Sequence, residues 1–219
     1  MTYRLVIGNK NTSSWSLRPW LAMRHAGLPF SEVNINLRDA DAKAQILAKS
    51  PSGKVPALLV GDRAIWDSLA ILEYLAEAHP ETSVWPKSRE ARAHARCVSA
   101  EMHSGFQPLR LDCPMDFLAR APRTVLAAEV GTDVRRIVSV WLDCRRQFGQ
   151  SGPFLFGAFS AADAMFAPVA SRFRTYVANL APYGDDGTAQ AYVDALFALP
   201  AITAWENGAR AEVAAQGQS

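Results

Sequence analysis

The sequence contains 219 residues, of which 49% are hydrophobic and 20% charged, a composition typical of a folded globular protein and not of a disordered one. Its 23 basic and 21 acidic residues are scattered along the chain and give a net charge of +2, so we expect no nucleic-acid partner, which would require a dense basic stripe. The three cysteines have neither metal-ligand nor Cys-x-x-Cys spacing, which argues against a disulfide framework and a metal site and favours a reducing compartment.

The first apolar run, residues 5–7, is too short for the apolar part of a signal peptide or for a membrane span. We therefore expect a cytoplasmic protein without membrane association. The run itself predicts a buried strand. A helix is expected next, starting near Trp15 and ending near Gly27, because Pro19 is tolerated only close to a helix start.

A second strand is predicted where Val33, Ile35 and Leu37 alternate with polar residues. After a mostly irregular or helical polar stretch, residues 55–60 and 63–66 flank a Gly-Asp pair that is typical of a two-residue hairpin. Asp and Ser at 67 and 68 then supply N-cap chemistry for another helix. The apolar face expected for this helix contains Leu69, Leu72 and Ala76.

From residue 89 onward the apolar period is that of helices, after a linker at residues 81–88. Two shorter helices are expected around 188–198 and 201–212, followed by a frayed tail from residue 214. The sequence thus predicts an α+β chain with a sheet domain at 1–80 and an all-helical bundle at 89–219. Its three long apolar stripes are Ala91, Ala95, Val98, Met102 and Phe106; Val130, Val134, Ile137, Trp141, Cys144 and Phe148; and Phe166, Val169, Phe173, Val177 and Leu180.

Three short segments have the chemistry of a ligand site. Ser13 and Ser14 precede the first predicted helix, where unpaired N–H groups and the helix dipole stabilise an anion. A cis bond before Pro56 would turn the Val55 backbone outward for pairing with an extended peptide, although an edge-strand proline in trans explains the sequence equally well. The residues at 67 and 68 could bind an ammonium and a carboxylate, with simple helix capping as the alternative there and at the two serines.

These segments resemble the signature blocks of the cytosolic glutathione S-transferases. The matching blocks are residues 13–18 (SSWSLR), 53–58 (GKVPAL), 67–71 (DSLAI) and 160–163 (SAAD), which occur in the family's order along nearly the whole chain. The resemblance implies a thioredoxin-like N-terminal domain, an all-α C-terminal helical bundle and a homodimer. It also implies glutathione as cosubstrate, no metal and a small-molecule electrophile as the second reactant.

By the same resemblance, Ser13 is the catalytic hydroxyl, five residues before an arginine, with Ser14 as the alternative. The hydroxyl would hydrogen-bond to the glutathione sulfur and keep it ionised, since the thiolate is the nucleophile. No cysteine precedes position 97 to support a cysteine-type mechanism, and the early tyrosine at position 3 lies in the first strand. The implied glutathione-binding residues are Trp15, Lys54, Val55, Pro56, Asp67 and Ser68.

The pocket for the electrophile is expected between the domains, bordered by Trp15. Its predicted lining is Met102, Phe106 and Leu109, although apolar residues at helical spacing usually belong to the core. Acidic substrates could be recognised by Arg110, Arg172 and Arg174, with structural or solvated arginines as the alternative.

Two other functions remain open at this point. The double serine is similar to the zeta class, whose members isomerise maleylacetoacetate, but Trp15 and Asp67 stand where that class usually has Cys and Gln. The second alternative is a protein with this fold that binds ligands or partners without catalysis. In the fourth matching block, Ser160 and Asp163 are expected to form a structural capping box.

Overall fold

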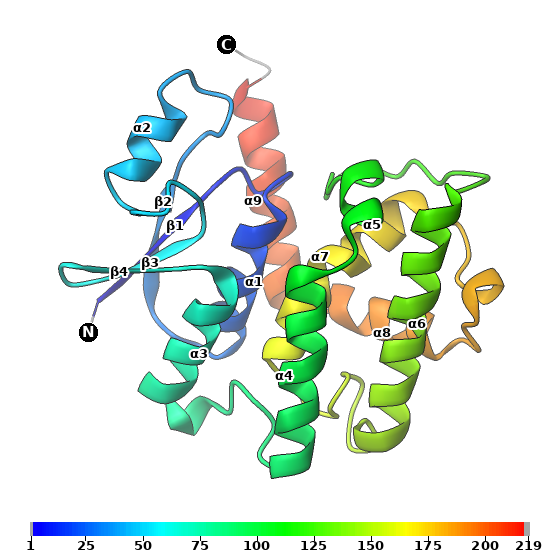
Figure 1. The fold of residues 1–219 in the computed structure, drawn as a ribbon. Helices are drawn as coiled ribbons and strands as arrows, with labels where there is room; N and C mark the ends of the chain where they lie inside the picture. Colours follow the sequence, from blue (N-terminus) through cyan, green and yellow to red (C-terminus); the bar gives the residue numbers. More distant parts are fainter. Residues whose placement is uncertain (1, 217–219) are drawn as a thin grey trace.

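A four-stranded sheet in the order β2-β1-β3-β4 forms the N-terminal part of the chain (Figure 1). β1 (Tyr3–Ile7) runs parallel to β2 (Phe30–Asn34) and antiparallel to β3 (Ala57–Val60), which forms a hairpin with β4 (Arg63–Trp66). The computed structural model describes residues 2–216. This mixed sheet and its helices match the thioredoxin-like domain implied by the sequence.

Helices cover both faces of the sheet, because alternate side chains of β1 point to opposite sides. Leu5 and Ile7 pack in the main core, which also contains residues of two helices of this part. On the other face of the sheet, Val6 packs with Ile46 and Ala57 in a smaller cluster. The helices of this part are α1 (Ser14–His25), α2 (Ala42–Leu47) and α3 (Ser68–Ala78).

The second strand lies earlier in the chain than predicted. It ends at Asn34, so the expected strand residues Ile35 and Leu37 follow it, and Leu37 is 40% exposed. The physical reason is the length of its partner: β1 stops at Ile7, whose carbonyl accepts the last ladder bond from the N–H of Ile35 at 2.9 Å.

The first helix starts at Ser14, one residue from the predicted start, and the predicted hairpin forms at Gly61, which adopts a positive φ of 57°. The predicted face of α3 is correct but incomplete. Leu72 is buried and Leu69 and Ala76 pack partly buried against the main core, and Ile71 and Leu75 widen this face because the helix packs against both α1 and α4.

The rest of the chain is helical, as the period of its apolar residues predicts. α7 lies at the centre and is buried nearly all round, in contact with α1 on one side and α4 on the other. Two single-turn 3₁₀ helices, Pro80–Thr82 and Ala181–Tyr183, lie in the connections. The α-helices are α4 (Arg89–Ser104), α5 (Gln107–Asp112), α6 (Ala128–Phe148), α7 (Ala161–Tyr176), α8 (Thr188–Phe197) and α9 (Pro200–Gln216).

Two of the three predicted stripes run past the end of their helix. Phe106 does not continue α4, because Pro108 has no N–H to extend the helical ladder and the chain turns at Phe106 with a positive φ of 60°. Val177 and Leu180 likewise follow the end of α7, which Val177 caps.

The last helix packs against the sheet domain although it is farthest from it in sequence. The indole of Trp205 on α9 donates to the carbonyl of Lys10 at 2.9 Å and lies 5.0 Å, centroid to centroid, from the ring of Trp20. The buried Lys10 ammonium contacts Glu32 at 2.5 Å and Glu212 at 3.7 Å. Figure 1 shows α9, in red, beside α1 in blue.

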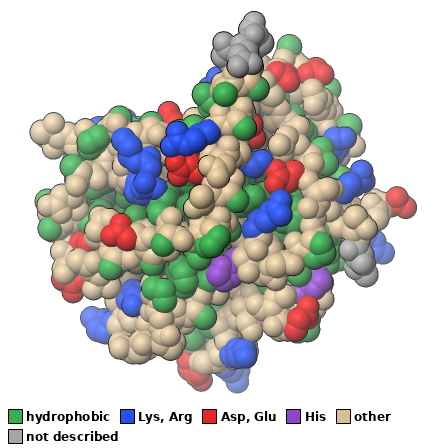
Figure 2. All heavy atoms as spheres, turned by 180° about the vertical axis from the view of Figure 1, so that it is seen from behind, with side chains coloured by type: hydrophobic (Ala, Val, Ile, Leu, Met, Phe, Trp, Pro, Cys, Tyr) green, Lys and Arg blue, Asp and Glu red, His purple; other side chains and the backbone are tan. Residues whose placement is uncertain are grey.

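Helix α9 is also longer than predicted, since residues 214–216 continue it instead of fraying, while the remainder of the predicted tail, residues 217–219, lies outside the described residues. Within residues 2–216, no helix is long and apolar enough to span a bilayer. On the face in Figure 2, basic and acidic side chains are interspersed without a large area of one sign.

Candidate functional site

A cavity of about 490 Å³ contains all six residues that the resemblance assigns to glutathione. They come from the start of α1, the segment before β3, and the junction of β4 with α3. The cavity wall also contains residues that sequence reasoning missed, one of them from α4 of the helical part. The lining residues are Trp15, Ser52, Lys54, Val55, Pro56, Trp66, Asp67, Ser68 and His103.

The segment before β3 presents its backbone to this cavity. The peptide bond between Val55 and Pro56 is cis, so the cis alternative is correct. The turn before it is held by Ser52, whose hydroxyl accepts the N–H of Lys54 at 3.2 Å. Residues 52, 54, 55 and 56 therefore form one continuous wall of the cavity.

The opposite wall is the start of α3. Asp67 has a φ of 75°, a strained conformation that side chains with short polar groups tolerate best. Its Oδ1 accepts the N–H groups of Leu69 and Ala70 at 2.9 and 3.3 Å, so the residue does cap the helix. Its Oδ2 takes no part in the cap, and the capping and binding interpretations are therefore compatible.

Ser68, which follows, is 1% exposed, and its hydroxyl accepts a hydrogen bond of 3.5 Å from Nη1 of Arg18. The site thus has a carboxylate next to a hydroxyl at a helix start. This pair can receive both an ammonium and a carboxylate.

The two candidate catalytic serines are buried at the edge of the site and do not line the cavity wall. Ser13 stands at the N-cap of α1 but makes no capping hydrogen bond with its side chain. Its hydroxyl instead lies 2.7 Å from that of Ser16, which accepts the N–H of Gly8 at 3.1 Å. The capping alternative is therefore wrong for the Ser13 side chain.

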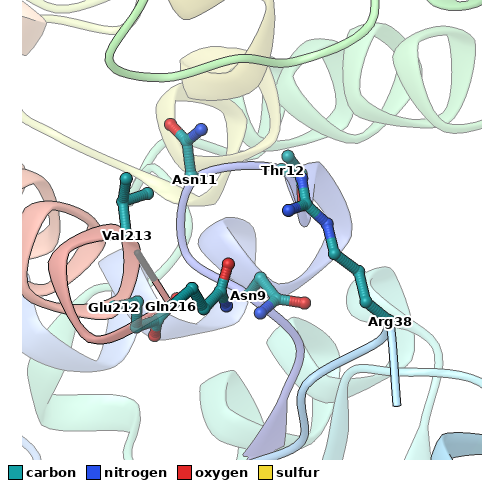
Figure 3. A pocket seen from close by; sticks show the side chains of 7 residues that line it. All are labelled: Asn9, Asn11, Thr12, Arg38, Glu212, Val213 and Gln216. Atoms are coloured by element: carbon teal, nitrogen blue, oxygen red, sulfur yellow. The ribbon is translucent and has the colours of Figure 1, made fainter. Parts of the chain in front are cut away.

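A second cavity, of about 360 Å³, lies near the same loop and is lined by Thr12, the residue before the serines (Figure 3). Arg38 and Glu212 line it from opposite sides. Since Trp15 lines the first cavity and Thr12 the second, the residues on either side of the two serines belong to different cavities.

Trp15 is held between two guanidinium groups. The Arg18 and Arg110 carbons Cζ lie 4.0 and 4.8 Å from its ring centroid, and the ring of His103 meets it edge-on at 5.2 Å. Such cation–π contacts stabilise by roughly 0.5–2 kcal/mol each. Trp15 therefore joins α1 to α4 and α5 while it forms part of the cavity wall.

Three arginines near this tryptophan, Arg18, Arg110 and Arg172, form no direct ion pair among residues 2–216, although the charges of Asp67 and Asp133 act on Arg18 and Arg110. Burial lowers the pKa of Arg18 well below its usual range, and the neighbouring Arg110 and Arg172 lower it further. Burial likewise lowers the pKa of Arg172 to about 10. The Nε atoms of Arg18 and Arg110 are buried without a described hydrogen-bond partner, whereas other nitrogens of Arg110 and Arg172 donate to backbone carbonyls. Arg174 lies apart, stacked 3.8 Å above Phe197.

The predicted substrate residues are placed in the core. Met102 and Leu109 are 0% exposed, Phe106 is 8% exposed, and none of the three lines the cavity. Their helical spacing reflects packing between α4, α5 and α6, and the core alternative applies to them. The exposed surface that faces the site from the helical part belongs to His103.

His103 is the clearest residue that sequence reasoning missed. It lies 36 residues after Asp67 in the numbering, yet its Nε2 is 3.1 Å from Oδ2 of that carboxylate. The residues around a histidine near the end of an amphipathic helix form no pattern that predicts its contact with a carboxylate far away in the sequence. Ser52 and Trp66 could have been found, because each stands beside a residue of a matching block.

The thiols of this chain lie away from the cavity. Burial raises the pKa of Cys144 to about 12 and raises that of Cys113, whereas Cys97 is exposed. A folded chain is therefore expected to react with one equivalent of an aromatic disulfide reagent, at Cys97, and an unfolded chain with three. Absorbance of the released thiolate, with Cys97→Ser as the control, measures both stoichiometries. More than one rapid equivalent from the folded chain would contradict the burial of the other two.

In the part of the chain that the structure describes, no three His, Cys, Asp or Glu side chains gather as ligands for a metal ion.

Comparisons with known proteins agree with this geometry. Residues 12–78 match the family model described as the glutathione S-transferase N-terminal domain. A probable maleylacetoacetate isomerase from Caenorhabditis elegans is 38% identical over 100 residues, which are 46% of each chain. Maleylacetoacetate isomerase from Rattus norvegicus is 28% identical over 80% of this chain and 79% of its own. A zeta-class glutathione S-transferase from Euphorbia esula is 34% identical over 48% of each. The chain thus spans about half the length of several curated relatives that it matches.

Solved structures share the whole fold. A glutathione transferase homologue from Burkholderia, with bound glutathione, superposes with a TM-score of 0.69 at 22% identity and covers 96% of this chain and 98% of its own. An Omega 2S glutathione transferase from Trametes versicolor has a TM-score of 0.70 at 20% identity and covers 100% of this chain and 99% of its own. At these identities the likeness concerns the fold.

Proposed function

Because this chain belongs to the glutathione S-transferase family, we propose that it is an enzyme that binds glutathione in the cavity at Asp67 and activates its thiol for attack on a small electrophile. The observation that carries the proposal is the gathering of all six predicted glutathione-binding residues in one cavity. The polar wall at Ser52 and Lys54, the backbone of Val55 and the Asp67–Ser68 pair suit a ligand with a carboxylate, a peptide unit and an amino-acid end.

Ser13 is the hydroxyl that we assign to the thiolate. The N–H of Gly8 donates to the Ser16 hydroxyl, which can in turn donate a hydrogen bond to Ser13 Oγ. The Ser13 proton is then free to point at a sulfur atom, and a chain of donors in one direction strengthens its last member. The start of α1 adds its partial positive charge. Ser14 has no such relay and stays the alternative.

These contacts can lower the pKa of the glutathione thiol enough to raise its ionised fraction at neutral pH. A free thiol has a pKa of about 8.5 and is only a few per cent ionised. Lowering that pKa by about two requires roughly 2.7 kcal/mol, which a charge-assisted hydrogen bond and a helix start can supply together. Holding the electrophile against the sulfur provides the rest of the rate.

A second candidate is the glutathione-dependent isomerisation of a maleylacetoacetate-type substrate. The positive charges of Arg18, Arg110 and Arg172 near Trp15, none of which forms a direct ion pair among residues 2–216, favour an acidic reactant. Rates on an aryl halide, a hydroperoxide and a maleylacetoacetate analogue distinguish conjugation, peroxide reduction and isomerisation. Glutathione binding without turnover of any of them would instead favour a binding protein.

The proposal includes a homodimer, as the family resemblance implies. Sedimentation velocity at micromolar concentration tests this part, and a monomer there would remove it.

The charge of Asp67 provides the test of the glutathione site. Asp67→Asn keeps the helix cap through its amide oxygen but removes the negative charge that faces an ammonium group. We expect the dissociation constant for glutathione to increase about tenfold, since a charge-assisted contact contributes about 1.4 kcal/mol more than a neutral one. Isothermal titration calorimetry measures it.

The matched control is Asp62→Asn, which makes the same chemical change in the exposed β3–β4 hairpin, away from the cavity. It should bind glutathione as the unmodified protein does. Equal affinities for both variants would contradict the assignment of the γ-glutamyl end to Asp67, and no binding by the unmodified protein would contradict the proposed function.

A further inference from the structure

One side chain from the helical part reaches into the proposed glutathione cavity. His103 stands near the end of α4 and lines the cavity opposite the start of α3. Its Nε2 lies 3.1 Å from Oδ2 of Asp67, the carboxylate oxygen that takes no part in the helix cap. The contact crosses between parts of the chain that are far apart in sequence, which makes it a feature of the tertiary structure.

His103 is held firmly where it stands. Its ring meets Trp15 edge-on at 5.2 Å, and the backbone carbonyls of Met102 and His103 accept hydrogen bonds from Nη2 of Arg110. The end of α4 and the imidazole are therefore packed against α1 and α5, with Nε2 of the ring 3.1 Å from Oδ2 of Asp67.

The other ring nitrogen decides the charge of this histidine. Nδ1 of His103 is buried and has no hydrogen-bond partner among residues 2–216. In the neutral ring the single proton is best placed on Nε2, whose neighbour is the Asp67 oxygen at 3.1 Å, and Nδ1 carries none. A second proton would have to sit on Nδ1 without an acceptor, which is unfavourable in a buried position.

The surrounding charges act on the same equilibrium. Burial lowers the pKa of His103, Asp67 at the start of α3 opposes this, and Arg18 on α1 and Arg110 on α5 lower the pKa further. Lys54 is a further cation in the same cavity wall. At neutral pH the imidazole is therefore uncharged, and the charge of Asp67 is not neutralised by it.

From these contacts we infer that His103 is a positioning residue for the glutathione site, which fixes the carboxylate of Asp67 toward the ligand's ammonium group without cancelling its charge. The inference rests on the proposed function, because the ammonium is that of the γ-glutamyl end. The N–H groups of Leu69 and Ala70 then hold Oδ1 by hydrogen bonds, and Nε2 of His103 contacts Oδ2 at 3.1 Å.

The same arrangement makes ligand binding depend on pH. When His103 becomes protonated, at a pH below its ordinary pKa of about 6.5, it forms an ion pair with Asp67. The carboxylate then attracts an ammonium less strongly. Affinity is therefore full above the His103 pKa and falls as the pH decreases through it.

The experiment uses S-methylglutathione, which has the γ-glutamyl ammonium but no titrating thiol. Calorimetric dissociation constants are measured at about pH 7.5 and about pH 5, the lower value lying well below the ordinary histidine pKa of about 6.5 because the pKa of His103 is lowered. We expect the unmodified protein to bind three- to tenfold more weakly at the lower pH, the loss that about 0.7–1.4 kcal/mol represents.

Two substitutions separate positioning from simple packing. His103→Gln keeps an N–H donor that can reach Asp67 but cannot be protonated, so its affinity at about pH 7.5 should stay within twofold of the original and should not change with pH. His103→Ala removes the donor and should weaken binding three- to tenfold at about pH 7.5. The matched control is His94→Gln on the same helix, which faces Asp143 at 3.8 Å and should change neither value.

The outcomes are distinct. Affinity that falls at low pH equally in the unmodified protein and in His103→Gln, or unchanged binding by His103→Ala, would overturn the role of His103 while leaving the proposed function intact. If the unmodified protein does not bind S-methylglutathione at either pH, the proposed function fails and the inference falls with it.

Discussion

Ser13→Ala is expected to make the thiol of bound glutathione clearly less acidic. Its pKa should increase from about 6.5 to about 8, because a hydrogen bond to a charged group contributes about 2 kcal/mol and is lost, while the start of α1 remains. At about pH 7 the ionised fraction would then fall from roughly three quarters to about a tenth, and the conjugation rate by about eightfold. Ultraviolet absorbance of the thiolate, titrated in the complex, measures the pKa directly.

Two neighbouring serines provide the controls. Ser14→Ala should leave the thiol pKa unchanged, because no relay of hydroxyls reaches Ser14. Ser16→Ala removes the group that joins the Gly8 N–H to Ser13, and an intermediate increase in the pKa is expected. A pKa that increases in Ser14→Ala and not in Ser13→Ala would transfer the role to the alternative serine. An unchanged pKa in both, with glutathione still bound, would contradict serine activation.

The largest effect on stability is expected from Asp163→Ala. This carboxylate is 0% exposed and forms the predicted capping box at the start of α7, the central helix of the bundle. Its oxygens accept hydrogen bonds from Leu155 N at 3.0 Å, Ser160 N at 2.7 Å and Ser160 Oγ at 3.0 Å. Alanine would leave these buried donors unpaired, so we expect the free energy of unfolding to decrease by about 3 kcal/mol, measured by urea denaturation.

An exposed helix cap is the matched control for this change. Asp186 at the start of α8 accepts the N–H of Thr188 at 3.0 Å at the protein surface. Asp186→Ala should cost about 1 kcal/mol or less, since water satisfies the freed donor. Equal losses for the two variants would mean that burial of the capping box contributes nothing.

Asp163 also predicts how stability depends on pH. Burial raises its pKa to about 6, above the value of about 3.9 for an unfolded chain. The folded state therefore holds this proton more tightly, so its contribution is present at low pH and is lost as the pH increases from about 4 to about 6. The difference in unfolding free energy between the unmodified protein and Asp163→Asn should consequently be largest below about pH 4 and smallest above about pH 6. A difference independent of pH would contradict the raised pKa.

Most of the secondary structure follows from local patterns. The period of apolar residues predicted the change from a sheet domain to helices, and the Gly-Asp pair predicted the hairpin. Errors occur where partners decide the outcome: Ile35 and Leu37 lie beyond β2 because β1 is short, and Phe106 leaves α4 because of Pro108. Both are consequences of a missing hydrogen-bond partner.

The candidate cavity was largely predictable because the six residues that the resemblance assigns to glutathione stand in three short blocks of the sequence. Trp15, Val55 and Asp67 could be named without a structure, and the structure brings them together. The substrate lining was not predictable in the same way. Met102 and Leu109 have the helical spacing that a core and a pocket wall share, and only packing against α6 and its neighbours distinguishes the two.

The sequence by itself determined what neighbours along the chain can encode: helix caps, the turn, the strand segments and the blocks that resemble the glutathione S-transferase signatures. Only the tertiary structure decided which oxygen of Asp67 stays available, that His103 lies 3.1 Å from it, and that Arg18 and Arg110 enclose Trp15. The reason is physical. Capping and turn formation depend on groups a few residues apart, whereas the charge of a buried carboxylate, imidazole or guanidinium depends on every element that packs around it.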